Sequence, residues 1–133
     1  MKHIISFLFL LLLISSCQNE NQTAALAAKG ISLELATYRK QQVADVKYEL
    51  AFNIPKTKAE AIPSELKLTA TILDLQHDLY LDFNEDASHI KSVVVNGETV
   101  VIQHEKEHII IPKADLKKGT NTIAISFDAG EMS

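Results

Sequence analysis

The amino-acid sequence predicts an all-β fold, an antiparallel β-sandwich or saddle of about seven strands, preceded by a signal peptide and one short helix. Three observations support this prediction. Apolar and polar residues alternate in several short segments, turn-forming residues separate these segments, and Asn96-Gly97 stands between two apolar runs. Alternation with a period of two places the apolar side chains on one face of a strand. Short strands at regular spacing favour two sheets that each bury one face.

The first residues have the pattern of a secretory signal peptide. Lys2 gives a positive start, and residues 4–14 form a nearly pure apolar run that ends at Ser15-Ser16-Cys17. This run is much shorter than the ~20 residues that cross a bilayer. Small residues at its end suit a processing enzyme. We therefore expect residues 1–16 to be removed.

Cys17 is the only cysteine in the sequence, so the chain cannot form an internal disulfide. Residues 13–17 resemble the bacterial lipobox, in which diacylglycerol is attached to the thiol before cleavage makes that cysteine the new N-terminus. More than one acyl chain gives stable membrane anchoring. The resemblance implies lipid attachment at Cys17 and a place in the bacterial cell envelope, facing the periplasm or the exterior. A plain signal peptide with an unrelated cysteine is the alternative.

Residues 17–29 continue as a polar and then alanine-rich stretch, which we interpret as the lipidated cysteine and a flexible tether. Residues 30–133 form the predicted domain. Ser32 is a good N-cap for one short helix, because apolar residues recur at helical spacing after it. The strands are predicted over residues 45–54, 65–72, 79–83, 90–95, 99–103, 108–111 and 122–127.

The first of these strands carries the clearest pattern. Val46, Tyr48, Leu50, Phe52 and Ile54 alternate with polar or small residues, which predicts a half-buried strand. Asn96-Gly97 predicts a hairpin, since both residues tolerate the positive φ angles of a type I′ turn.

The charge balance gives no indication of nucleic-acid binding. Processing removes one of the 13 basic residues, Lys2, and none of the 17 acidic ones, so the mature chain is net negative. The basic residues are scattered, tryptophan is absent, and aromatic residues make up 6% of the sequence. Neither a phosphate-binding stripe nor a base-stacking platform is therefore expected.

The segment His104-Glu105-Lys106-Glu107-His108 matches the zinc-peptidase signature H-E-x-x-H. Two histidines four residues apart bind one zinc ion when they lie on a helix. Here β-branched runs flank the segment at residues 100–102 and 109–111, and Pro112 follows. In an extended strand, residues four apart lie about 13 Å from one another. We therefore interpret His104, Glu105 and His108 as a charged hairpin turn, with no metal ligand and no catalytic residue.

Other patterns that carry chemistry are absent from the sequence. It has no Gly-rich phosphate loop and no serine in a nucleophile-elbow context. Asp74, Asp78 and Asp82 are interpreted as solvated surface residues and turn caps. We expect no catalytic residue and no cofactor in this chain.

The order of several segments resembles the start of the aminopeptidase N family of zinc metallopeptidases. The segments are Ser32–Arg39, Val46–Leu50, Leu79–Phe83, Val95–Gly97, Glu107–Pro112, Leu116 with Gly119 and Asn121, and Ile123–Phe127 with Ala129-Gly130. The likeness covers about residues 30–133. It implies the family's N-terminal β domain, a saddle of sheets that packs on a thermolysin-like catalytic domain.

The family's catalytic motifs have no counterpart in this chain. The Gly-x-Met-Glu-Asn motif, the helical H-E-x-x-H and the catalytic tyrosine are missing, and Phe127 stands where the spacing would place the glutamate ligand. The resemblance therefore implies a chain truncated before the catalytic domain. This chain should be inactive alone, and zinc and peptide substrates are implied only for the full-length parent.

Two functional hypotheses follow. The first is the N-terminal non-catalytic segment of a membrane-anchored zinc aminopeptidase, which removes N-terminal residues from peptides. Its partners are the membrane, through Cys17, and the missing catalytic domain. The second is a complete small β-sandwich lipoprotein that binds a protein or a carbohydrate. A severed domain should expose an apolar face meant for its neighbour, whereas a complete domain should not.

Overall fold

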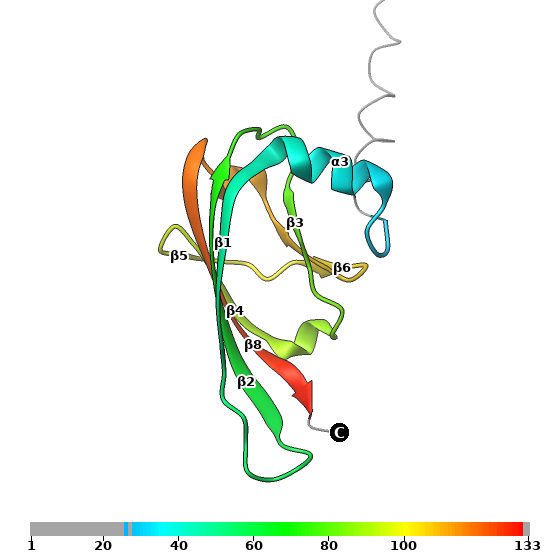
Figure 1. Ribbon diagram of the computed structural model, residues 1–133, viewed down its shortest axis with the longest axis vertical. Helices are drawn as coiled ribbons and strands as arrows, with labels where there is room; N and C mark the ends of the chain where they lie inside the picture. Colours follow the sequence, from blue (N-terminus) through cyan, green and yellow to red (C-terminus); the bar gives the residue numbers. More distant parts are fainter. Residues whose placement is uncertain (1–25, 27, 132–133) are drawn as a thin grey trace, which may run out of the picture.

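The computed structural model describes residue 26 and residues 28–131 (Figure 1). The predicted signal peptide, Cys17 and most of the tether lie outside the described residues. The described part is one helix and eight strands in two antiparallel sheets, so the all-β sandwich prediction is confirmed. The large sheet has the order β1-β2-β8-β4-β5, and the small sheet has the order β3-β7-β6.

The helix and strands have the following bounds. They are α3 (Leu33–Gln42), β1 (Val43–Phe52), β2 (Ala61–Ile72), β3 (Leu79–Asp82), β4 (Ile90–Val95), β5 (Glu98–Val100), β6 (His104–Glu105), β7 (His108–Ile111) and β8 (Gly119–Glu131). Two short 3-10 turns, Ala87–His89 and Lys113–Asp115, precede β4 and β8.

Helix α3 begins where the sequence predicts. The backbone N–H of Leu35 donates to the Ser32 hydroxyl oxygen at 3.0 Å, which satisfies one of the free N–H groups of the first turn. Glu34 in the first turn and Arg39 in the last turn both have the charge that the helix dipole favours. The helix leads directly into β1, so α3 lies at the end of the large sheet where β1 begins (Figure 1).

A β-bulge lets the apolar residues of β1 stay on one face. Val43 and Val46 are three residues apart, so a regular strand would place them on opposite faces. The pairing of β1 with β2 shifts between Ala44 and Lys47, and Asp45 has a φ of 52°. The extra residue restores the alternation, and Tyr48 and Leu50 then pair with Leu68 and Leu66.

The core lies between the two sheets and is built from the facing sides of both. Its buried members are Leu68, Ala70, Ile72, Leu79, Ile90, Val93, Val95, Ile109, Ile111, Leu116, Ile123 and Ile125. Strand β8 is central because it pairs with both β2 and β4. In Figure 1 the large sheet continues past the small sheet to the β1–β2 loop, so the small sheet covers only part of its inner face.

Two hairpins have turns with positive φ angles. Asn96 and Gly97 have φ values of 53° and 92° between β4 and β5, which confirms the predicted hairpin. Lys106 and Glu107 have φ values of 50° and 70° between β6 and β7. The second turn therefore uses a left-handed backbone without the residues that adopt it most easily.

The packed domain begins earlier than residue 30, the predicted boundary. Leu26 is buried against Leu35, Tyr38 and Tyr80. These residues form a second, smaller cluster beneath α3. The predicted tether includes residue 26 because no apolar periodicity surrounds it, and a single buried leucine gives no periodic signal.

Candidate functional site

The most unusual surface of the domain is a row of apolar side chains along β1. We call Val46, Tyr48, Leu50, Phe52 and Ile54 the apolar row. These side chains are 45–60% exposed. A contiguous exposed apolar patch in a soluble domain marks an interaction surface more often than isolated exposed apolar residues do.

The apolar row lies on the core-facing side of the large sheet. Tyr48 pairs with Leu68, which is 2% exposed, and paired residues of an antiparallel ladder share a face. The prediction that β1 is half-buried is therefore wrong. Its apolar side chains lie together on the core-facing side, as the alternation predicts, but they are exposed. β1 is the edge strand of the large sheet, and the small sheet does not extend far enough to cover it.

A groove of about 280 Å³ runs between β1 and β3, the facing edges of the two sheets. Leu66, Leu68 and Ala70 of β2 contribute apolar side chains to it, and Val46 and Tyr48 contribute the start of the apolar row. Residues 79–82 form the opposite side, where the carboxylate of Asp82 and the guanidinium of Arg39 are also present. The groove thus combines an apolar lining with one ion pair at its rim.

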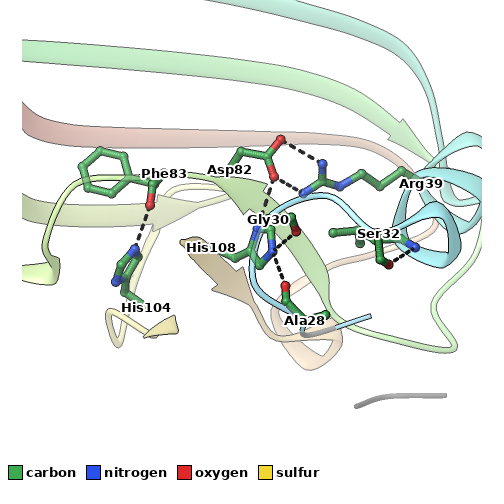
Figure 2. Close-up of polar contacts among 9 residues, drawn as sticks. Ala28, Gly30, Ser32, Arg39, Asp82, Phe83, His104 and His108 are labelled. Atoms are coloured by element: carbon green, nitrogen blue, oxygen red, sulfur yellow. Dashed lines mark hydrogen bonds and ion pairs between the residues drawn. The ribbon is translucent and has the colours of Figure 1, made fainter. Parts of the chain in front are cut away.

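Arg39, Asp82 and His108 form a polar cluster beside this groove (Figure 2). The two terminal nitrogens of Arg39 donate to the two carboxylate oxygens of Asp82 at 2.9 and 2.6 Å, a bidentate arrangement. These hydrogen bonds, followed by the charges of Arg39 and His108, hold the pKa of Asp82 below its ordinary value, although burial opposes them.

His108 connects the cluster to the N-terminal segment. Its ring is 1% exposed, and Nε2 lies 3.1 Å from the carbonyl oxygen of Ala28 and 3.0 Å from that of Gly30. Carbonyl oxygens only accept, so Nε2 carries a proton and donates to them. Nδ1 lies 3.2 Å from Asp82, an ion-pair distance, but it makes no hydrogen bond of acceptable angle.

This cluster is structural rather than catalytic. A histidine beside an aspartate occurs in catalytic triads, where the free ring nitrogen activates a nucleophile. Here the distal nitrogen of His108 is engaged by two backbone carbonyls, and the ring is closed to solvent. The arrangement joins α3, β3, β7 and the segment at residues 28–30, so its effect is to fix four parts of the chain together.

The H-E-x-x-H residues lie on the β6–β7 hairpin. His104 pairs with Ile109 and Glu105 pairs with His108, so the two histidines lie on opposite faces of the ribbon. The Nε2 atom of His104 contacts the carbonyl oxygen of Phe83 at 2.9 Å, whereas His108 faces Ala28 and Gly30 (Figure 2). Within residues 28–131 and Leu26, no group of three or more His, Cys, Asp or Glu side chains is arranged to hold a metal ion.

The three aspartates have different roles. Asp74 accepts from the Tyr38 hydroxyl at 2.9 Å and from the backbone of Gln76, and burial of the phenol is the main reason that the pKa of Tyr38 rises to about 12. Asp78 accepts from the backbone N–H of Lys113 at 2.9 Å. Asp74 and Asp78 thus cap loops, as predicted.

The ion pair of Asp82 was not predicted from the sequence. Asp82 pairs with Arg39 across a separation of 43 residues. No local pattern contains that information, because the contact forms only when α3 packs beside the end of β3.

Neither a scan against protein-family models nor a search of curated proteins finds a match to this sequence. α3 is too short and too polar to span a bilayer, and the rest of the described chain has no helix that could do so.

Proposed function

We propose that this chain is the N-terminal, non-catalytic β domain of a membrane-anchored zinc aminopeptidase, an enzyme that removes N-terminal residues from peptides. The single observation that favours this role is the apolar row, since a domain made to pack on a neighbour exposes an apolar face. Leu50 and Phe52 are 54% and 53% exposed, so covering either of them would contribute about 1 kcal/mol of hydrophobic free energy before the costs of association. Docking of a catalytic domain is therefore the role that we assign to this face.

Zinc chemistry belongs to the parent enzyme in this proposal. Both ring nitrogens of His108 face backbone carbonyls or a carboxylate, and His104 lies on the opposite face of the hairpin, so the two histidines do not form a shared zinc site as the domain is folded. The domain's contribution is to position a neighbouring catalytic domain on the membrane.

The decisive experiment is to sequence the gene beyond the codon for Ser133. We expect an open frame of several hundred codons that contains Gly-x-Met-Glu-Asn and an H-E-x-x-H within a helical context. A stop codon at that point in the natural gene would overturn the proposal. It would favour instead a complete β-sandwich lipoprotein that binds a protein or a carbohydrate, for which the groove of about 280 Å³ is the candidate site.

Membrane anchoring through Cys17 is tested separately. In cells fed radiolabelled fatty acid, the wild-type chain should carry label and fractionate with membranes. The Cys17→Ser variant, which differs from the wild type only at that position, should lose the label. Equal labelling of both chains would contradict lipid attachment at Cys17.

A further inference from the structure

We propose that β1 pairs with β1 of a second copy of this chain, antiparallel and across a two-fold axis at Tyr48, so that the two large sheets become one. This inference concerns the edge of the sheet and does not depend on the proposed enzyme. Hydrogen bonding at the edge lies in the plane of the sheet, so the apolar row stays available on its face.

The first basis is the set of backbone groups at the open edge. The N–H of Asn53 donates to the carbonyl oxygen of Pro63 at 2.9 Å, so this residue directs its backbone toward β2. Backbone direction alternates along a strand, so Lys47, Glu49 and Ala51 also face β2. Tyr48, Leu50 and Phe52 therefore direct their N–H and C=O groups to the open edge, where a further strand can bond to them.

The second basis is charge complementarity. With the axis at Tyr48, Lys47 of one copy stands opposite Glu49 of the other, and Glu49 stands opposite Lys47. These are the positions of an antiparallel ladder that make no backbone hydrogen bonds to each other, where side chains lie closest. Within one copy Lys47 already contacts Glu49 at 2.8 Å. Lys67 also pairs with Glu49 across β2, so charges would alternate across the joined sheets.

The neighbouring registers are unfavourable. Moving the axis to Glu49 places two glutamates opposite each other, and moving it to Lys47 places two lysines opposite each other. Like charges directly opposite in a ladder are destabilising. Moving the axis to Leu50 sets Glu49 opposite Ala51 and removes both opposite-charge pairs. The axis at Tyr48 also sets Val46 opposite Leu50, which unites the apolar rows of the two copies.

A two-fold contact of this kind is closed, because the same strand is used on both sides. The bulge at Asp45 limits the regular part of the pairing to about residues 46–50. The contact is therefore short, and it discourages addition of further strands.

Disulfide formation at single sites tests the register. The full chain carrying Cys17→Ser and Tyr48→Cys has its only cysteine at the proposed axis, where the two Cα atoms lie about 5.5 Å apart. The matched control carries Cys17→Ser and Leu50→Cys. Leu50 is on the same face and is similarly exposed, at 54% against 58% for Tyr48. In the proposed register, position 50 is offset from itself by four residues, about 13 Å.

Under oxidising conditions, with both chains purified at equal concentration, we expect the chain with Cys at position 48 to form covalent dimers at least about tenfold faster than the control. Equal or faster dimer formation by the control would overturn the register. Failure of both chains to form dimers, with circular dichroism showing folded β-structure, would overturn the pairing.

Charge reversal provides a second test at solvent-exposed positions. In the Tyr48→Cys background, Lys47→Glu or Glu49→Lys alone should slow dimer formation about tenfold, since both cross-strand pairs become repulsive. Chains with Lys47→Glu mixed with chains with Glu49→Lys should form mixed dimers at the original rate. If the mixture forms no more dimers than either variant alone, the pairing is wrong. Docking of a catalytic domain is unaffected by either result.

Discussion

The centre and the β1 edge of the large sheet's inner face show how the same residue pattern leads to different burial. In β2 and β8, Leu68 and Ile123 pair across the centre of the large sheet and are 2% and 1% exposed. In β1, Tyr48 pairs with Leu68 on the same face and is 58% exposed. Alternation determines which face a side chain lies on. A second element must lie over that face before the side chain is buried, and the small sheet ends before β1.

The largest expected effect is the difference in stability loss between shortening a side chain that the small sheet covers and shortening one on β1 that it does not cover. Ile123→Ala should lower the free energy of unfolding by about 2–5 kcal/mol, because it leaves a cavity in the covered core. Leu50→Ala, on the same face but uncovered, should change it by less than about 0.5 kcal/mol. Urea denaturation of the full chain measures both. Similar losses for the two variants would show that β1 is covered in solution.

A smaller effect on stability is expected at the rim of the groove, where the small sheet faces the exposed strand β1. Asp82→Asn removes the bidentate partner of Arg39, whose side chain is 20% exposed. Because the Asp82 carboxylate is itself half exposed, we expect a loss of about 1 kcal/mol at neutral pH. Glu49→Gln is the control, since its partner Lys47 lies in solvent, and its effect should be smaller.

The same pair gives a pH dependence of defined sign. The pKa of Asp82 in the folded chain is lowered from the ordinary value of 3.8, chiefly by its hydrogen bonds with Arg39. Its contribution is therefore complete above pH 3.8 and is lost as the pH falls through the lower folded value. The stability difference between wild type and Asp82→Asn should shrink in that acid range. A difference that grows on acidification would contradict this assignment.

The smallest expected effect is in the small sheet, which covers the core, at the β6–β7 hairpin. Glu107 has a φ of 70°, which glycine adopts without strain. Glu107→Gly should raise the free energy of unfolding by about 0.5 kcal/mol. Lys29→Ala controls for the lost surface ion pair between Lys29 and Glu107. A clear destabilisation by Glu107→Gly alone would indicate that the glutamate side chain does more than form that ion pair.

Local chemistry made much of the fold predictable. Ser32 determines the start of α3 through one hydrogen bond, and Asn96-Gly97 determines a hairpin through backbone conformation. Both signals depend on a few adjacent residues. The bulge at Asp45 was not predicted, although the three-residue spacing of Val43 and Val46 is the pattern that requires it.

The candidate site was less predictable because its parts are distant in sequence. The cluster of Arg39, Asp82 and His108 comes from three elements, and Leu26 joins the domain by a single buried side chain. The apolar residues of β1 were identified, but their exposure depends on how far the small sheet reaches. That length is a property of tertiary packing and leaves no mark within β1.

The claim that β1 is an open edge which recruits a partner is tested most directly by residue-resolved amide hydrogen exchange on the full chain at two protein concentrations. We predict that the Lys47 and Glu49 amides are protected at both concentrations, because they face β2. The Tyr48 and Leu50 amides should exchange rapidly in dilute samples and become protected in concentrated ones. Protection of Tyr48 and Leu50 that does not change with concentration, or no protection at either concentration, would contradict the account.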